Sequence, residues 1–163
     1  RRYAYLLLES PVRPAVESGA TGWVFRPLDA RAMRAAAALL IGEHDFSAFR
    51  SSECQARTPV KTLHEITIGR HGAYWRFEFE ANAFLHHMVR NLMGCLLAVG
   101  TGVRPPAWVG QVLADRDRRL AAPTFAPDGL YFLGPRYDEQ LGLPRRTPAH
   151  DWLPGSAAED APR

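Results

Sequence analysis

The stretch from Ala81 to Gly100 constrains the fold most, because it is a long apolar run that contains a single arginine. Its apolar side chains recur every three or four residues, as they do on one face of an α-helix. Asn82 is a suitable N-cap, and Gly100 is a suitable C-terminal stop. The pattern therefore predicts a helix over 81–100 with most of its surface buried.

Arg90 is the arginine in this run, and a cation near a core face needs either water or an anion. In one interpretation the side chain extends along the edge of the helix, so that the guanidinium reaches solvent. In the other, Arg90 faces a carboxylate or a phosphate at the floor of a cleft. The spacing of residues leaves both interpretations open.

The other segments predict an α+β protein, an antiparallel sheet with helices packed on one face. Asp29 is a good N-cap for a helix that Gly42 should stop. The segment 43–60 is polar and basic, and its Pro59 prevents a continuous helix. Segments in which apolar and polar residues alternate predict strands at 3–9, 23–25, 62–69, 73–81 and 129–133. Segments whose apolar residues recur at helical spacing predict helices at 30–41 and 105–118.

The two strands at 62–69 and 73–81 are predicted to form a β-hairpin with one face exposed to solvent. In the second, aromatic residues alternate with Arg76, Glu78 and Glu80. Side chains of a strand point to opposite faces in turn, so these three charged residues should face solvent.

Length and composition fit one globular domain or half of a larger one. Of 163 residues, 47% are hydrophobic and 23% are charged, the balance of an ordinary globular protein, and a chain of this length needs no disulfide for stability. We expect Cys54 and Cys95 to be reduced thiols. The longest apolar run is too short for a bilayer and no signal peptide opens the chain, which favours the cytoplasm and no membrane contact. The start at Arg1, with no initiator methionine, suggests a fragment.

Motifs for metal or nucleophilic catalysis are missing from the sequence. His86 and His87 are adjacent and would point about 100° apart on a helix, which does not suit a metal. Neither G-x-S-x-G nor a P-loop occurs. The net charge of +3 favours a polyanionic partner only weakly. We therefore expect no metal.

Three separate features could together hold a flipped base. They are an aromatic strand start at Tyr3, the lone Arg90, and the segment that contains Leu130. Tyrosine offers a stacking face and a hydroxyl, leucine offers an apolar wall, and arginine can orient an acid or bind phosphate. Taken singly, each has a structural explanation, since tyrosine and leucine usually pack in a core.

Four blocks of the sequence are similar to the C-terminal half of TruA-type tRNA pseudouridine synthases. They occur in the order and spacing of that family over about residues 1–138. The blocks are R-R-Y-A-Y at 1–5, L-L-I-G-E-H-D-F-S-A-F-R with C-Q-A-R-T-P at 39–59, N-A-F-L-H-H-M-V-R-N at 82–91, and A-P-D-G-L-Y at 126–131.

The resemblance implies a cofactor-free isomerisation of uridine to pseudouridine at positions 38 to 40 of the tRNA anticodon stem-loop. It implies that Tyr3 stacks on the uracil and transfers a proton, that Arg90 pairs with the catalytic aspartate, and that Leu130 packs on the base. It also implies a homodimer, to which Trp108 and the C-terminal tail would contribute. Arginine-rich loops are expected to bind RNA, with six candidates: Arg1, Arg13, Arg26, Arg50, Arg57 and Arg76.

The nucleophilic aspartate of that family is not found in this sequence. It belongs to a G-R-T-D-A-G-V-H-like motif of the N-terminal half, and no such motif occurs here. We therefore expect residues 1–142 to form a C-terminal catalytic and RNA-binding domain that is inactive without the N-terminal half, and 143–163 to be a flexible tail. The alternative is a non-catalytic RNA-binding or dimerisation module.

Overall fold

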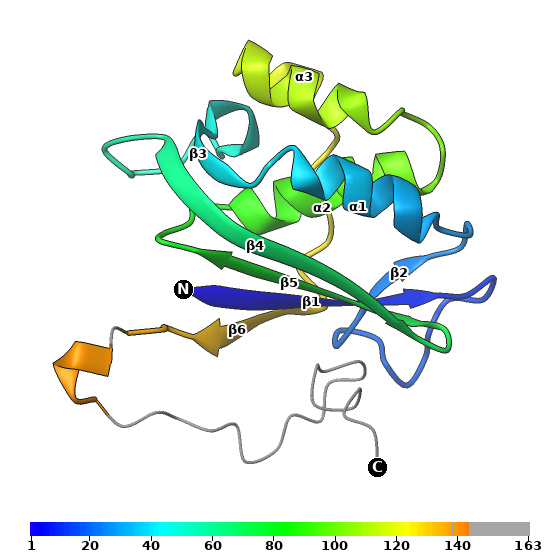
Figure 1. Ribbon diagram of the computed structural model, residues 1–163. Helices are drawn as coiled ribbons and strands as arrows, with labels where there is room; N and C mark the ends of the chain where they lie inside the picture. Colours follow the sequence, from blue (N-terminus) through cyan, green and yellow to red (C-terminus); the bar gives the residue numbers. More distant parts are fainter. Residues whose placement is uncertain (138, 144–163) are drawn as a thin grey trace.

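The computed structural model describes residues 1–137 and 139–143, which form one sheet covered by helices on one face (Figure 1). A flexible tail was predicted for 143–163, and its residues 144–163 lie outside the described residues. Three α-helices and six strands follow one another within the described residues: β1 (Arg2–Glu9), β2 (Gly22–Val24), α1 (Ala30–Ala38), β3 (Gly42–Asp45), β4 (Val60–His71), β5 (Tyr74–Ala81), α2 (Met88–Gly100), α3 (Ala107–Asp115) and β6 (Leu130–Gly134).

The sheet is built around the β4–β5 hairpin, with β3 beside β4 and β1 beside β5, all antiparallel. The other edge of β1 is shared by two short strands. β6 pairs antiparallel with residues 2–5 of β1, whereas β2 pairs parallel with residues 7–9. The predicted α+β class is confirmed, with β2 as the one parallel pairing among the described strands.

Alternation along the strands separates a core face from an open face. On the core face, Tyr5 lies opposite Phe77, and Leu7 lies opposite Trp75. These four side chains are at most 1% exposed and pack with α2, whose Leu92 is fully buried. Burial of apolar surface of this size is the main force that holds helix and sheet together.

The predicted helix over 81–100 begins seven residues late, at Met88. Asn82 does not cap it: its side-chain Oδ1 accepts hydrogen bonds from the N–H of Thr62 (3.0 Å) and of Ala83 (2.7 Å). Residues 83–87 instead cross from the sheet to the helix, and His87 has a left-handed backbone (φ 61°). Both histidines of the pair therefore precede the helix rather than lie along it.

The first helix is shorter than predicted at its C-terminal end. Asp29 caps α1 as expected, accepting a hydrogen bond from Ala32 N–H (3.0 Å). The helix ends at Ala38, because Gly42 (φ 113°) already begins β3, where it pairs with Leu63. The segment 43–60, for which the sequence excluded only a continuous helix, thus contains an edge strand and a short 3₁₀ turn at Ser47–Phe49.

The third helix, α3, spans Ala107–Asp115, inside the predicted 105–118, and buries Val109, Val112 and Leu113. Within residues 1–137 and 139–143, no helix combines the length and the apolar character needed to cross a bilayer.

Candidate functional site

Tyr3 stands near the start of β1, on the face of the sheet that carries the helices. Its half-buried ring packs edge-on against Phe84 and at a tilt against Phe132, with ring centroids 5.1 Å apart in both cases. Phe84 comes from the segment that precedes α2, and Phe132 lies opposite Tyr3 in β6. Three separate segments of the chain thus form one aromatic group at this end of the sheet.

Arg90 lies in the first turn of α2 and is half-buried. Its Nε donates a hydrogen bond to the main-chain oxygen of Phe125 (2.7 Å), and Phe125 N–H donates in return to the main-chain oxygen of Arg90 (3.2 Å). No carboxylate of the described residues pairs with its guanidinium. The two Nη groups can therefore receive an acid, while Nε fixes the orientation of the group.

Leu130 begins β6 directly after a tight turn. Leu130 N–H donates to Pro127 oxygen (3.1 Å), and the turn residue Gly129 has φ 96°, a backbone that glycine adopts without strain. In the sheet, Leu130 lies opposite Tyr5, two residues along β1 from Tyr3. Leu130 and Tyr3 are therefore on the same face of neighbouring strands.

Tyr5 is a residue of this region to which the sequence assigned no role. Its hydroxyl, on a fully buried side chain, donates to the main-chain oxygens of Ala126 (2.9 Å) and Asp128 (2.5 Å). Burial raises the pKa of this hydroxyl well above its ordinary value; the charge of Asp128 adds to the rise, and Arg90 opposes it. The phenol stays protonated and holds the loop that leads into β6.

The structure thus brings the three predicted site residues to one region. Tyr3 and Leu130 are carried by adjoining strands, and Arg90 is bonded to the loop that precedes Leu130. A phenol, an apolar side chain and a guanidinium whose two Nη groups bond to no other described residue could accommodate a planar base and an acid.

The six predicted RNA-binding arginines differ in accessibility. Four are exposed, namely Arg1, Arg13, Arg26 and Arg57. Arg50 is half-buried and donates from Nη2 to the main-chain oxygens of Cys54 (2.6 Å) and Ala56 (3.0 Å).

The burial of Arg76 contradicts the prediction that this face of β5 is exposed to solvent. Its side chain is only 4% exposed and forms an ion pair with Glu78 (2.7 Å). The two residues share one face of β5, two positions apart. A buried, paired guanidinium does not bind phosphate, so Arg76 is removed from the RNA-binding set.

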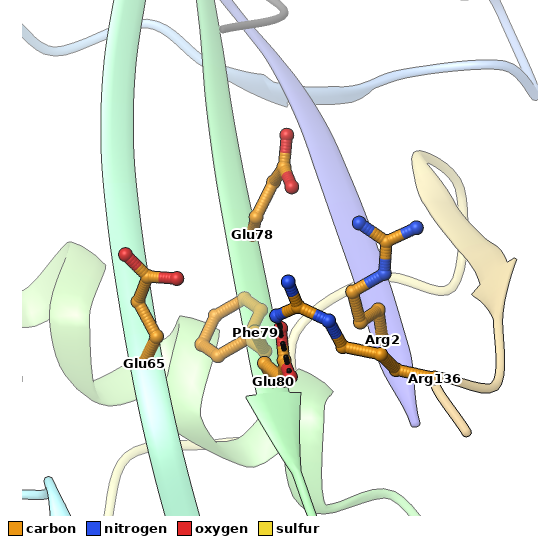
Figure 2. A pocket seen from close by; sticks show the side chains of 6 residues that line it. All are labelled: Arg2, Glu65, Glu78, Phe79, Glu80 and Arg136. Carbon is orange, nitrogen blue, oxygen red and sulfur yellow. Dashed lines mark hydrogen bonds and ion pairs between the residues drawn. The ribbon is translucent and has the colours of Figure 1, made fainter. Parts of the chain in front are cut away.

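A polar hollow of about 220 Å³ lies on the open face of the sheet (Figure 2). Glu65, Glu78 and Arg2 project into it from β4, β5 and β1, and Arg136 pairs with Glu80 (3.1 Å) at its side. The carboxylates balance the arginines around them. The hollow is consequently a poor site for the phosphates of a nucleic acid.

The rings of His86 and His87 stack on each other, with centroids 3.9 Å apart. Because both residues precede α2, the angle of about 100° expected between neighbouring side chains on a helix does not apply to them. Burial lowers the pKa of His87, and His86 and Arg90 act in the same direction. Among the described residues, no cluster of three histidine, cysteine or acidic side chains could hold a metal ion.

Comparisons with known proteins relate most of the chain to one family. The family described as tRNA pseudouridine synthase matches residues 36–138. The chain is 79% identical over 154 residues to tRNA pseudouridine synthase A of Methylibium petroleiphilum, and 65% identical over 158 residues to that of Polaromonas naphthalenivorans. Both alignments cover 94% of this chain, but only 59% and 60% of the relatives. The chain therefore spans about 60% of the length of these curated relatives.

Proposed function

The chain belongs to the tRNA pseudouridine synthase family, and from this premise we propose that it forms one half of an active site that converts uridine to pseudouridine in tRNA. The target is a uridine at positions 38 to 40 of the anticodon stem-loop. The orientation of Arg90 by Phe125 is the observation that carries the proposal, since it leaves the two Nη groups of the guanidinium for a carboxylate.

The reaction needs no cofactor, because it is an isomerisation. The bond between N1 of uracil and C1′ of ribose breaks, the base turns, and C5 forms the new bond to C1′. C5 loses its proton and N1 gains one, so neither an oxidant nor a reductant is required. An aspartate from the N-terminal part of the protein starts the process, and Arg90 holds this acid in its ionised form.

Tyr3 and Leu130 supply the walls for the base in this proposal. The ring of Tyr3 stacks on the uracil, and its hydroxyl accepts the C5 proton while it passes its own proton to solvent, from which N1 is protonated. Leu130 packs against the base from β6, which lies beside Tyr3 in the sheet. We also propose that the protein acts in the cytoplasm, where it meets tRNA, and that it acts as a homodimer with Trp108 near the subunit contact.

The experiment that tests the function uses a chimera in which this chain replaces the matching part of the Methylibium petroleiphilum relative. We expect the chimera to release tritium from tRNA labelled with [5-³H]uridine, because C5 loses its hydrogen only when the new bond forms. The chain by itself should release none. Tight tRNA binding without tritium release by the chimera would favour the binding-module alternative.

Tyr3→Phe should separate stacking from proton transfer. Phenylalanine preserves the contacts with Phe84 and Phe132 but lacks the hydroxyl. We expect tritium release to fall about 10²-fold or more, the usual effect of removing a proton-transfer group, with tRNA affinity unchanged. Full activity of Tyr3→Phe would remove the hydroxyl from the mechanism.

Arg57 is the exposed arginine that we expect to bind a tRNA phosphate near the site. Its loop packs on the segment before α2, where Ser51 N–H donates to His86 oxygen (3.1 Å). Arg13, in contrast, stacks on Trp23 of β2, and β2 pairs with the end of β1 that lies away from Tyr3.

Arg57→Gln should weaken tRNA binding and lower the slope of log affinity against log salt by about 0.7–0.9, the value of one phosphate contact. Filter binding at several salt concentrations measures both effects. Arg119→Gln changes the net charge equally, but Arg119 is already neutralised by Asp117 (2.6 Å), so it serves as the control. Equal slopes in the two variants would exclude Arg57 as a phosphate ligand.

A further inference from the structure

We propose that Arg118 is a positioning residue, which orients the Arg90 guanidinium by fixing the loop 121–125 against α2. The catalytic consequence rests on the proposed function, but the positioning itself does not. Arg118 lies in the short 3₁₀ turn after α3, outside the blocks that carry the family resemblance.

The orientation of Arg90 depends on where the Phe125 peptide lies. Arg90 Nε donates to Phe125 oxygen at 2.7 Å, and the reciprocal backbone bond from Phe125 N–H to Arg90 oxygen is 3.2 Å long. A shift of this peptide away from α2 would release the Nε donor. The guanidinium would then be free to rotate, and its Nη groups would lose their fixed direction.

Arg118 holds the loop on the N-terminal side of Phe125. Its Nη1 donates to Ala122 oxygen (2.8 Å), and its Nη2 donates to Thr124 Oγ1 (3.0 Å) and to the side-chain oxygen of Asn91 (3.1 Å). One planar group thus bonds the loop at two points and α2 at the residue that follows Arg90. Lysine, with a single ammonium nitrogen, cannot reproduce this fork.

Asn91 anchors the same network inside the protein. Its side chain is fully buried; Oδ1 also accepts from Thr124 Oγ1 (2.6 Å), and Nδ2 donates to Phe49 oxygen (2.8 Å). A buried polar network whose members are all bonded is rigid, because any broken bond leaves a desolvated group without a partner. The network therefore fixes the loop relative to α2.

A second attachment holds the loop on the other side of Phe125. The Tyr5 hydroxyl bonds to the oxygens of Ala126 and Asp128. Phe125 is consequently held between two fixed points, and Arg118 supplies the one that is bonded to α2 itself. All three described partners of Arg118 are uncharged, so its guanidinium serves geometry rather than charge pairing.

The test compares Arg118→Lys with Arg119→Lys in the chimera. Arg119 is the adjacent arginine, but its side chain is 88% exposed and bonds only to Asp117 among the described residues, so it is the matched control. Solvent exchange of the Arg90 Nε–H, followed by nitrogen-15 NMR, should become about tenfold faster in Arg118→Lys, the factor expected for a lost hydrogen bond. It should be unchanged in Arg119→Lys.

Activity gives a second readout. In Arg118→Lys the single-turnover rate of tritium release should fall about 10- to 100-fold, as for a misplaced catalytic group, with tRNA affinity unchanged. If Arg118→Lys does not fold, Thr124→Val removes one bond to Arg118 and one to Asn91 at constant side-chain shape, and should change both readouts in the same direction.

An unchanged exchange rate of the Arg90 Nε–H in Arg118→Lys, or in Thr124→Val where the first variant does not fold, overturns the proposal. A wild-type rate of tritium release by the same variant of an active chimera also overturns it. A wild-type chimera that releases no tritium contradicts the proposed function instead. The NMR comparison then still decides whether Arg118 positions Arg90.

Discussion

Arg90→Lys in the chimera is expected to reduce tritium release from [5-³H]uridine-labelled tRNA by about 10³-fold, because the guanidinium makes two kinds of contact at once. Its Nε donates to Phe125 oxygen, and in the proposed function its Nη groups bind the catalytic acid. A lysine ammonium at this place could bind one of the two partners but not both in fixed geometry. Single-turnover rates at saturating tRNA measure the effect on chemistry separately from binding.

Arg34→Lys is the matched control for Arg90→Lys. Arg34 lies on α1, is exposed, and also donates to a main-chain oxygen, that of Ile68 (2.8 Å). We expect this variant to retain the wild-type rate and the wild-type tRNA affinity. If Arg90→Lys kept its rate within tenfold of wild type, the assignment of Arg90 as the partner of the aspartate would be wrong.

Gly94→Ala should destabilise the protein by about 2–4 kcal/mol, although alanine is intrinsically the better helix former. A Cβ at Gly94 would come within 2.3 Å of Pro123 oxygen, a distance that no Cβ tolerates. The loop 121–125 would have to move off α2. Urea unfolding of the chimera measures the stability, and the rate of tritium release should fall with it, since Arg90 depends on the same loop.

The control for this substitution is Gly110→Ala in α3. The nearest atom to a Cβ there is Leu39 Cδ1 at 3.4 Å, an ordinary contact with a flexible side chain. We expect Gly110→Ala to be neutral or to stabilise by up to about 1 kcal/mol through helix propensity. Equal stabilities of the two variants would mean that the loop adapts to a side chain at Gly94.

The local patterns of the sequence predicted most elements of the fold. Alternation of aromatic and charged residues located β5, and Asp29 located the start of α1, since both signals depend only on neighbouring residues. The predicted start of α2 was wrong because the apolar residues at helical spacing already begin at Phe84, and this spacing does not show where an extended segment gives way to a helix. The role of Asn82 depends on Thr62, twenty positions away.

The site was less predictable than the fold. Tyr3, Arg90 and Leu130 were assigned through the family resemblance, and their roles stay predictions. The burial of Arg76 was missed because alternation gives the face of a strand but not whether that face is covered. Likewise, the contacts of Arg118 with Asn91 connect residues 27 positions apart, for which the sequence contains no local signal.

The two short strands on the outer edge of β1 have a consequence for the order of folding. The Tyr5 hydroxyl bonds to Asp128 oxygen across 123 positions of the chain, whereas the β4–β5 hairpin forms from adjacent residues. Contacts between distant residues form late, and short edge strands open before a central hairpin does. β6 can therefore detach while the hairpin and its helices stay folded, so the region of Tyr3 and Leu130 should be the last part of the domain to assemble and the first to be lost on mild heating.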